Sequence, residues 1–222
     1  MGLIITALTA QIRNRNRVNV FLDGDFAFGL SRIIAAWLHV GQELSDEKIA
    51  ALQAEDSQEV AYQKVIRYLS YRQRSTDEVR RHLEKQGASP EITETVMERL
   101  LRNGLIDDQR LAQDWVENRS DHRPRSRRAL VYEMKQKGIP EGAIEQALVD
   151  WDEEEMAYQA ARKQARKIKH LDWLEFRQKM VAHLARRGFS YETAAPAVSR
   201  IWQEMSEYKD MHNDDHSQEV DR

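Results

Sequence analysis

The chain has 222 residues, of which 41% are hydrophobic and 32% are charged, and its formal net charge at pH 7 is -3. It contains no cysteine, which excludes disulfide bonds, thiolate metal ligands and thiol catalysis. No apolar run approaches the ~20 residues of a membrane-spanning helix, and the N-terminus lacks the basic start and cleavage site of a secretory signal. We therefore expect a predominantly helical protein of the cytoplasm with no membrane partner.

Residues 1–54 are expected to form a small N-terminal subdomain. Two β-prone runs between residues 3 and 30 are broken by an Asn-Arg-Asn segment and by the turn signal Asp23-Gly24-Asp25. They predict a β-hairpin or a three-strand meander. A helical pattern follows from residue 31, with a turn at Gly41 and a short helix from about Ser45.

From residue 55 onward the apolar periodicity is helical and repeats. Helix patterns stop at Gly87, Gly138 and Gly188, and a second helix pattern starts at once after each of them. Aligned on these glycines, which lie about 50 residues apart, the flanking apolar residues keep step, as in an internal repeat. The sequence predicts a mainly α fold, a tandem array of three three-helix repeats over residues 55–103, 104–151 and 152–206.

The starts and ends of the helices in these repeats have a local physical cause. Each of the three glycines suits the left-handed position just after a helix, so we interpret them as structural. Ser75 and Glu78 form a capping box that starts a helix. The large apolar residues on the helical faces are interpreted as packing residues and not as stacking platforms for bases: Trp115, Trp151, Trp173 and Trp202.

Charge is distributed unevenly. Residues 207–222 are acidic and have no apolar period, so they are predicted to be a disordered acidic tail. Their net charge is -4, from six acids and two bases, so residues 1–206 carry a net charge of +1. The sharpest basic segment lies between Arg119 and Lys137. Guanidinium groups along a helix edge suit phosphates and acidic protein surfaces. Around Arg125 the chain also enters a helix N-terminus, where the dipole and free backbone N–H groups favour anions.

These considerations select a set of candidate binding residues. The alternative is that these basic residues have no ligand and form solvated faces, with arginine stems covering apolar surface. The main candidates are Arg123, Arg125, Arg127, Arg128, Lys135 and Lys137. Secondary candidates are Arg72, Arg74, Arg162, Lys163, Arg166, Lys167, Lys169, Arg186 and Arg187, and weaker ones, beside the first β turn, are Arg13, Arg15 and Arg17.

Recognisable catalytic chemistry is absent from the sequence. No phosphate-binding glycine loop, zinc-binding H-E-x-x-H or nucleophile elbow occurs. The acidic pairs Asp23 with Asp25 and Asp107 with Asp108 suit a turn and a helix N-terminus. We therefore expect no enzyme activity, no cofactor and no metal.

Several spaced motifs occur in one order: Leu69-Ser70-Tyr71-Arg72 with Ser75, the junction from Asn103 to Asp108, Lys137-Gly138, and the run from Arg186 to Tyr191. With these motifs the chain, over roughly residues 3–205, resembles the RecX family of bacterial recombination regulators. The resemblance implies a binding protein that binds the RecA filament on single-stranded DNA and lowers RecA's recombinase and co-protease activities. It would contact the single-stranded DNA together with RecA or through RecA. The chain departs from the family pattern at Arg74, often a proline, and at Gln86, which replaces the lysine of a Lys-Gly pair.

Two other functions remain open. A stand-alone DNA-binding module would use the same arginines on phosphates, would not need RecA, and would weaken steeply with salt. A helical-repeat scaffold for another protein partner would hold its partner without DNA. The acidic tail either keeps the chain soluble or competes with DNA for the basic faces. A monomer is expected because the array closes its own core.

Overall fold

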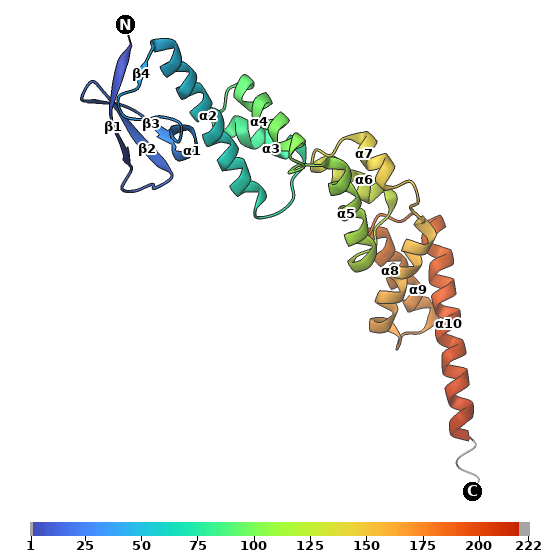
Figure 1. Cartoon of the computed structure of the whole chain (residues 1–222). Coiled ribbons are helices and arrows are strands. Elements are labelled where there is room, and N and C mark those ends of the chain that lie inside the picture. The colour runs from blue at the N-terminus through green and yellow to red at the C-terminus, as the bar shows by residue number, and fades with distance from the viewer. Residues whose placement is uncertain (1, 218–222) are drawn as a thin grey trace. The chain divides into compact units, whose positions relative to one another are not determined.

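The structure is a computed structural model that describes residues 2–217, with side chains as far as Glu207. The chain forms two compact units, residues 1–106 and 107–222 (Figure 1). The predicted mainly helical fold with a small N-terminal sheet is confirmed. Within the described residues, no helix is long and apolar enough to cross a membrane.

The N-terminal sheet is antiparallel, with strand order β3-β2-β1-β4. The strands are β1 (Leu3–Ala10), β2 (Arg17–Leu22), β3 (Asp25–Ser31) and β4 (Glu43–Leu44). The turn between β2 and β3 has positive φ at both Asp23 (48°) and Gly24 (99°), which suits a tight hairpin. The predicted meander is therefore present, and β4 is a short fourth strand that the sequence reading did not include. Ile5, Val20 and Leu30 form the fully buried centre of the core of this N-terminal sheet.

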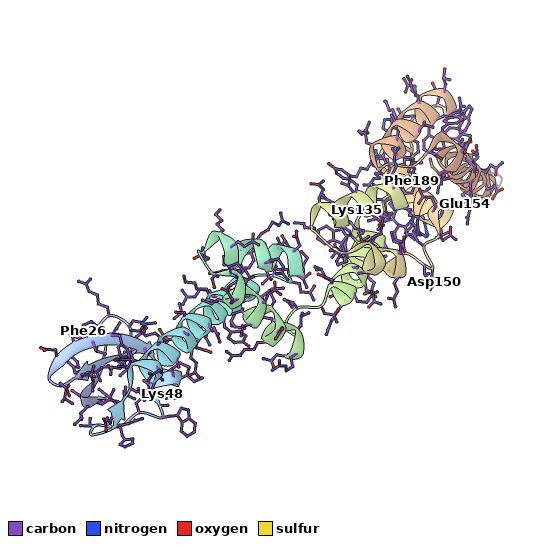
Figure 2. The ribbon with its side chains drawn as sticks, turned by 90° about the horizontal axis from the view of Figure 1, so that it is seen from above. Phe26, Lys48, Lys135, Asp150, Glu154 and Phe189 are labelled. Carbon is purple, nitrogen blue, oxygen red and sulfur yellow. The ribbon has the colours of Figure 1, made fainter. Side chains whose placement is uncertain are left out.

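One helix joins this sheet to the first repeat. After the short α1 (Arg32–Ala35), helix α2 (Asp46–Leu69) runs unbroken where the sequence reading placed two helices, because no glycine or proline interrupts it. Its first half contributes Leu52 to the sheet core, and its second half contributes Tyr62 and Val65 to the next core. The expected boundary between residues 54 and 55 thus falls inside α2. Phe26 of β3 and Lys48 of α2 lie at the sheet end of this unit (Figure 2).

The first repeat consists of the second half of α2 with α3 (Thr76–Lys85) and α4 (Pro90–Arg102), which lie beside it (Figure 1). The predicted capping box is confirmed, because Ser75 Oγ accepts from the Glu78 backbone N–H at 3.1 Å and Glu78 Oε2 accepts from the Ser75 N–H at 3.4 Å. Val79, Leu83 and Leu100 fill the core.

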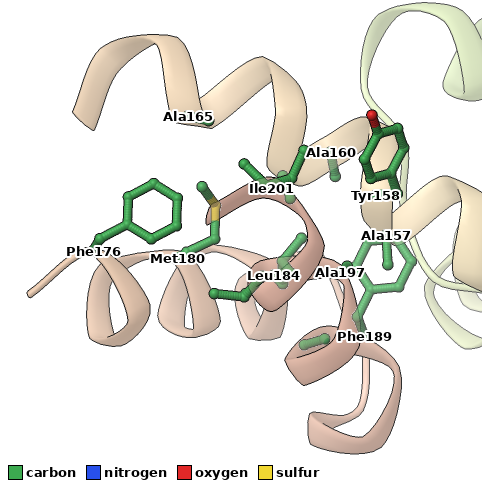
Figure 3. Close-up of a cluster of buried hydrophobic side chains, with 13 residues drawn as sticks. Ala157, Tyr158, Ala160, Ala165, Phe176, Met180, Leu184, Phe189, Ala197 and Ile201 are labelled. Atoms are coloured by element: carbon green, nitrogen blue, oxygen red, sulfur yellow. The ribbon is translucent and has the colours of Figure 1, made fainter. Parts of the chain in front are cut away.

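The second unit holds the other two repeats. One is formed by α5 (Asp108–His122), α6 (Arg127–Gln136) and α7 (Glu141–Ala147), the other by α8 (Glu153–Ile168), α9 (Trp173–Arg186) and α10 (Tyr191–Ser217). In the third repeat, Phe176, Met180 and Leu184 of α9 face small alanines of α8 and Ile201 of α10 (Figure 3). Trp202 packs at its edge, 5.1 Å from the Phe176 ring, as the packing interpretation of the tryptophans requires.

The acidic segment begins inside α10. Its backbone remains helical to Ser217, because no glycine or proline follows Pro196 in this helix. The helix thus continues into the first part of the segment for which the sequence predicts disorder. Residues 218–222 lie outside the described residues.

All three repeat glycines lie just after a helix with positive φ, at 80° for Gly87, 70° for Gly138 and 93° for Gly188. In each case the next residue's N–H bonds to the carbonyl five positions back, as from Ala88 to Leu83 at 3.1 Å. This is the Schellman pattern, which satisfies the last carbonyls of a helix. The structural interpretation of the glycines is confirmed.

Candidate nucleic-acid interface

Two arginines of the basic segment, Arg119 and Arg125, are paired inside their own repeat. Glu133 of α6 accepts from Arg119 Nε at 2.8 Å and from the Trp115 indole N–H at 3.0 Å, and Arg125 Nη1 lies 2.9 Å from its other oxygen. Since Glu133 is mostly buried and holds two guanidinium groups, much of this positive charge is neutralised before any partner arrives.

The N-terminus of α6 is also occupied by the protein's own groups. The Arg127 backbone N–H donates to Glu153 at 2.6 Å, and the Ala129 N–H donates to the Ser126 hydroxyl at 3.1 Å. The Arg127 guanidinium donates to the Leu148 carbonyl at 2.5 Å. Two of the backbone N–H groups that were predicted to be free for an anion are therefore already hydrogen-bonded, one of them to an acid from α8.

The remaining members of the cluster divide in two. Lys135 lies 2.7 Å from Glu141 in an exposed ion pair, and Lys137 lies over the Trp115 ring at 5.7 Å. Arg123 and Arg128 are exposed, and their side chains make no hydrogen bond or ion pair with any described residue. The structure thus leaves only two side chains of the predicted cluster openly available.

The second half of α8 carries a stronger exposed basic surface. Five exposed bases lie within eight residues there, and no acidic residue interrupts them. Lys163 donates to the backbone carbonyl of Asp121, and the others have no hydrogen-bond or ion-pair partner among the described residues. We call the following four residues the α8 basic face: Arg162, Arg166, Lys167 and Lys169.

Part of this face is explained without any ligand, as ordinary solvated charge. Arg166 and Lys167 lie in the last turn of α8, where the helix dipole favours cations. Arg162 lies a full turn earlier, where the dipole effect has fallen off. The opposite side of the helix is a row of buried alanines at Ala157, Ala161 and Ala165, so α8 is packed on one side and basic on the other.

Arg187, a secondary candidate, joins the second and third repeats instead of facing solvent. Its guanidinium donates to the Pro124 carbonyl at 3.0 Å and to His183 Nε2 at 2.9 Å, and its own carbonyl accepts from the Ser126 N–H at 3.1 Å. Burial, and then the nearby charges of Arg187 and other bases, lower the pKa of His183 to about 4. Arg186 beside it is exposed.

The two aromatic residues after this arginine pair differ. Phe189 is 4% exposed and belongs to the core, so it offers no surface to a base. Tyr191 is more than half exposed, and its hydroxyl accepts from Arg177 at 2.6 Å.

Candidates in the first unit are mostly committed to internal contacts. Arg72 lies 2.6 Å from Glu78, and Arg74 lies over the Tyr68 ring at 4.1 Å. Arg17 pairs with the buried Asp56 at 2.9 Å. Arg13 and Arg15 are exposed in the turn between β1 and β2.

A groove in the first unit was missed by the sequence reading. It has a volume of about 1200 Å³ and runs between the turn before β2, α1, the second half of α2 and the end of α3. Lys64 and Arg67 of α2 and Arg32 of α1 line it. None of the three was among the predicted site residues, because only the fold brings α1 and α2 together.

The fold and these surfaces define a class of protein: a tandem helical-repeat protein with exposed basic faces. Among the described residues, no group of three or more histidine, aspartate or glutamate side chains could hold a metal ion.

Comparison with known proteins makes the assignment specific. Family models match the RecX N-terminal domain at residues 3–45 and the first, second and third three-helix domains of RecX at residues 61–100, 107–148 and 152–198. The regulatory protein RecX of Bacillus licheniformis is 35% identical over 87% of this chain and 76% of its own length. That of Bacillus subtilis is 31% identical over 91% and 79%. The chain belongs to the RecX family of regulatory proteins.

Solved structures agree with this result. A crystal structure of regulatory protein RecX is similar with a TM-score of 0.66 and 28% identity, over 86% of this chain and 96% of that chain. The crystal structure of RecX from Lactobacillus salivarius has a TM-score of 0.56 at 23% identity, over 68% and 98%, which shows a shared fold.

Proposed function

We propose that this chain binds the RecA filament on single-stranded DNA and lowers its recombinase and co-protease activities. Membership in the RecX family of regulators supports the partner. The single observation in the structure that supports the mode of binding is the α8 basic face, whose four cations have no partner among the described residues. In this proposal the chain acts in the cytoplasm as a monomer, and it acts by binding and without catalysis.

The chemistry of the face suits such a filament. A nucleoprotein filament presents phosphates and acidic side chains, and both attract exposed guanidinium and ammonium groups. Arg162, Arg166 and Lys169 follow one another at spacings of four and three residues, so they form one stripe along α8. Arg123 and Arg128 are the members of the predicted cluster whose side chains remain available for the same partner.

The test is RecA's ATP hydrolysis on single-stranded DNA, with the full chain titrated from well below stoichiometry. The variant Arg166→Glu with Lys167→Glu should need about tenfold more protein for half inhibition, equivalent to ~1.4 kcal/mol. The matched control is Arg110→Glu with Lys179→Glu, which makes the same charge change at two exposed bases outside the face. The control should inhibit as the unaltered chain does.

The same titration separates the alternatives. Inhibition that appears only when the DNA itself is saturated would indicate a stand-alone DNA-binding module. If both double variants inhibit as well as the unaltered chain, the α8 basic face is not the contact surface. Absence of any inhibition would remove the filament proposal as a whole.

A further inference from the structure

The groove of the first unit is large and open on the surface. Its volume of about 1200 Å³ exceeds the roughly 300–1000 Å³ of typical small-molecule pockets. One wall is the second half of α2, and the other is formed by α1 and the turn that precedes β2. A groove of this size suits a stretch of polymer chain better than a compact ligand.

The charge along the groove is positive. Lys64 and Arg67 from α2 and Arg32 from α1 are exposed, and none of their side chains has an ion-pair or hydrogen-bond partner among the described residues. The acid in the lining, Glu59, is buried and already lies 2.6 Å from the Arg99 guanidinium. Three available cations therefore face the groove while its carboxylate is neutralised, which favours an anionic occupant.

Aromatic rings lie beside these cations. Tyr68 stacks on His82 with ring centroids 3.9 Å apart and planes 3° from parallel, and Arg74 lies over the Tyr68 ring. Tyr71 is 78% exposed at the same groove. Tyr71 has no hydrogen bond or ring contact with a described residue, so it is the ring that can accept a stacked base.

The sequence places cations and ring in one row. Lys64, Arg67 and Tyr71 follow at spacings of three and four residues, so on α2 and its C-terminal turn they point to one side. We propose that this groove is a binding site for single-stranded nucleic acid, with phosphates on Lys64, Arg67 and Arg32 and a base stacked on Tyr71. A duplex is disfavoured because its bases are already stacked on each other and leave no face for Tyr71.

The site lies in the first unit and needs neither RecA nor the α8 basic face, so it stands or falls separately from the proposed function. An acidic peptide would satisfy the three cations but would gain little from an exposed aromatic ring. Combined cations and rings are what sequence-tolerant single-strand binders use. Tyr71 therefore favours nucleic acid over acidic protein.

The test is fluorescence anisotropy of a labelled oligothymidylate with the full chain and no RecA. Lys64→Glu with Arg67→Glu should weaken binding at least tenfold and lower the slope of log affinity against log salt by about 1.4, or ~0.7 per lost phosphate contact. Both residues are exposed, and only Arg67 lies in a last helical turn where the dipole favours a cation, so the thermal unfolding midpoint should fall only slightly. Lys48→Glu with Arg102→Glu is the matched control, with the same charge change at exposed sites outside the groove.

Two further arms make the assignment specific. Each double variant is also measured on the Arg166→Glu, Lys167→Glu background, so that binding by the α8 basic face does not hide the groove. Photocrosslinking of an oligonucleotide that carries iodouracil should label Tyr71, and Tyr71→Ala should abolish that label while Tyr71→Phe keeps it.

Several results would overturn the proposal. One is equal affinity of the groove variant and the control on both backgrounds. Another is crosslinking that maps only to residues 107–222. A third is polyglutamate that binds as tightly as the oligonucleotide, depends on Lys64 and Arg67, and leaves Tyr71 without a crosslink, which would assign the groove to an acidic protein partner.

Discussion

Arg125 Nη1 lies 2.9 Å from Glu133 Oε1, and this ion pair shows why a basic stretch of sequence is not the same as a basic surface. Glu133 lies eight residues after Arg125 and reaches back to it across the first turns of α6. It also holds Arg119, which lies on the preceding helix. The segment from Arg119 to Lys137 differs from the second half of α8 in how many of its basic side chains are unpaired, and not in how many bases it contains.

Replacing Glu133 with glutamine should therefore expose charge. Arg119 and Arg125 lose their carboxylate, so we expect tighter binding of single-stranded DNA and a steeper salt dependence. We also expect a loss of about 1–2 kcal/mol of unfolding free energy, because two charge-assisted contacts are weakened at a mostly buried acceptor. Anisotropy and urea unfolding measure the two effects.

The control for this variant is Glu141→Gln. Its ion pair with Lys135 is exposed at both partners, so the change in unfolding free energy should be much smaller than for Glu133→Gln. Equal loss of stability in both variants would mean that Glu133 does not anchor the two arginines.

Gly188 should tolerate alanine less well than Gly87. Both have positive φ, which costs an alanine about 1–2 kcal/mol. At Gly188 the added Cβ would also meet the Ala129 Cβ at 2.9 Å and the Ser126 hydroxyl, whereas nothing lies within 4 Å at Gly87. We expect Gly188→Ala to cost a further ~1–3 kcal/mol through overpacking. Urea unfolding of the two variants measures the difference, and equal costs would contradict the close packing of these repeats.

Acidification should destabilise the junction between the second and third repeats. The folded chain holds His183 neutral, with its pKa lowered from the usual 6.5 to about 4 by burial and by nearby arginines. The unfolded chain protonates it near pH 6.5, so the unfolded state binds more protons between these values and stability falls as pH drops from 6.5 to 4. We expect this residue to contribute about 1–2 kcal/mol to the fall, less than the full shift would give because the ring is partly exposed.

His183→Gln tests this contribution, because glutamine keeps an acceptor for Arg187 but does not titrate in this range. Urea unfolding at pH 7 and at pH 4.5 should show a smaller loss of stability for the variant than for the unaltered chain. An equal loss in both would assign the acid sensitivity to other groups.

Phe176→Ala should be among the more damaging single changes in the third repeat. The side chain is fully buried and packs against Trp202, so its removal should cost about 3–5 kcal/mol. Leu174 is its control, since it lies two residues away on the same helix and is 71% exposed. Leu174→Ala should stay within ~0.5 kcal/mol in the same urea titration. A small cost at Phe176 would mean that this core repacks.

Sequence reasoning succeeded where the physical cause is local. The capping box at Ser75 and the glycine after each second helix follow from backbone geometry over a few residues, so the three-repeat fold was predictable. The long α2 was also within reach, because no breaker separates its halves. The interruption inferred near residue 54 had no chemical signal behind it.

The candidate surfaces were less predictable because pairing is a tertiary property. Glu153 lies 26 residues from Arg127 in the chain yet accepts its backbone N–H, and Arg187 reaches Pro124 across 63 residues. Neither contact has a pattern in the sequence. The groove likewise forms only where α1 and α2 lie together. Its cations Arg32 and Lys64 are more than 30 residues apart in the sequence.

The continuity of α2 has a consequence for how the first unit comes apart. Leu52 and Val65 belong to different cores but to one rod of hydrogen bonds, so neither core can melt without fraying the helix that supports the other. The sheet and the first repeat should therefore lose their amide-exchange protection together, as one foldon. A nucleic acid held along α2 would slow exchange in the strands of the sheet as well as in the helices it touches.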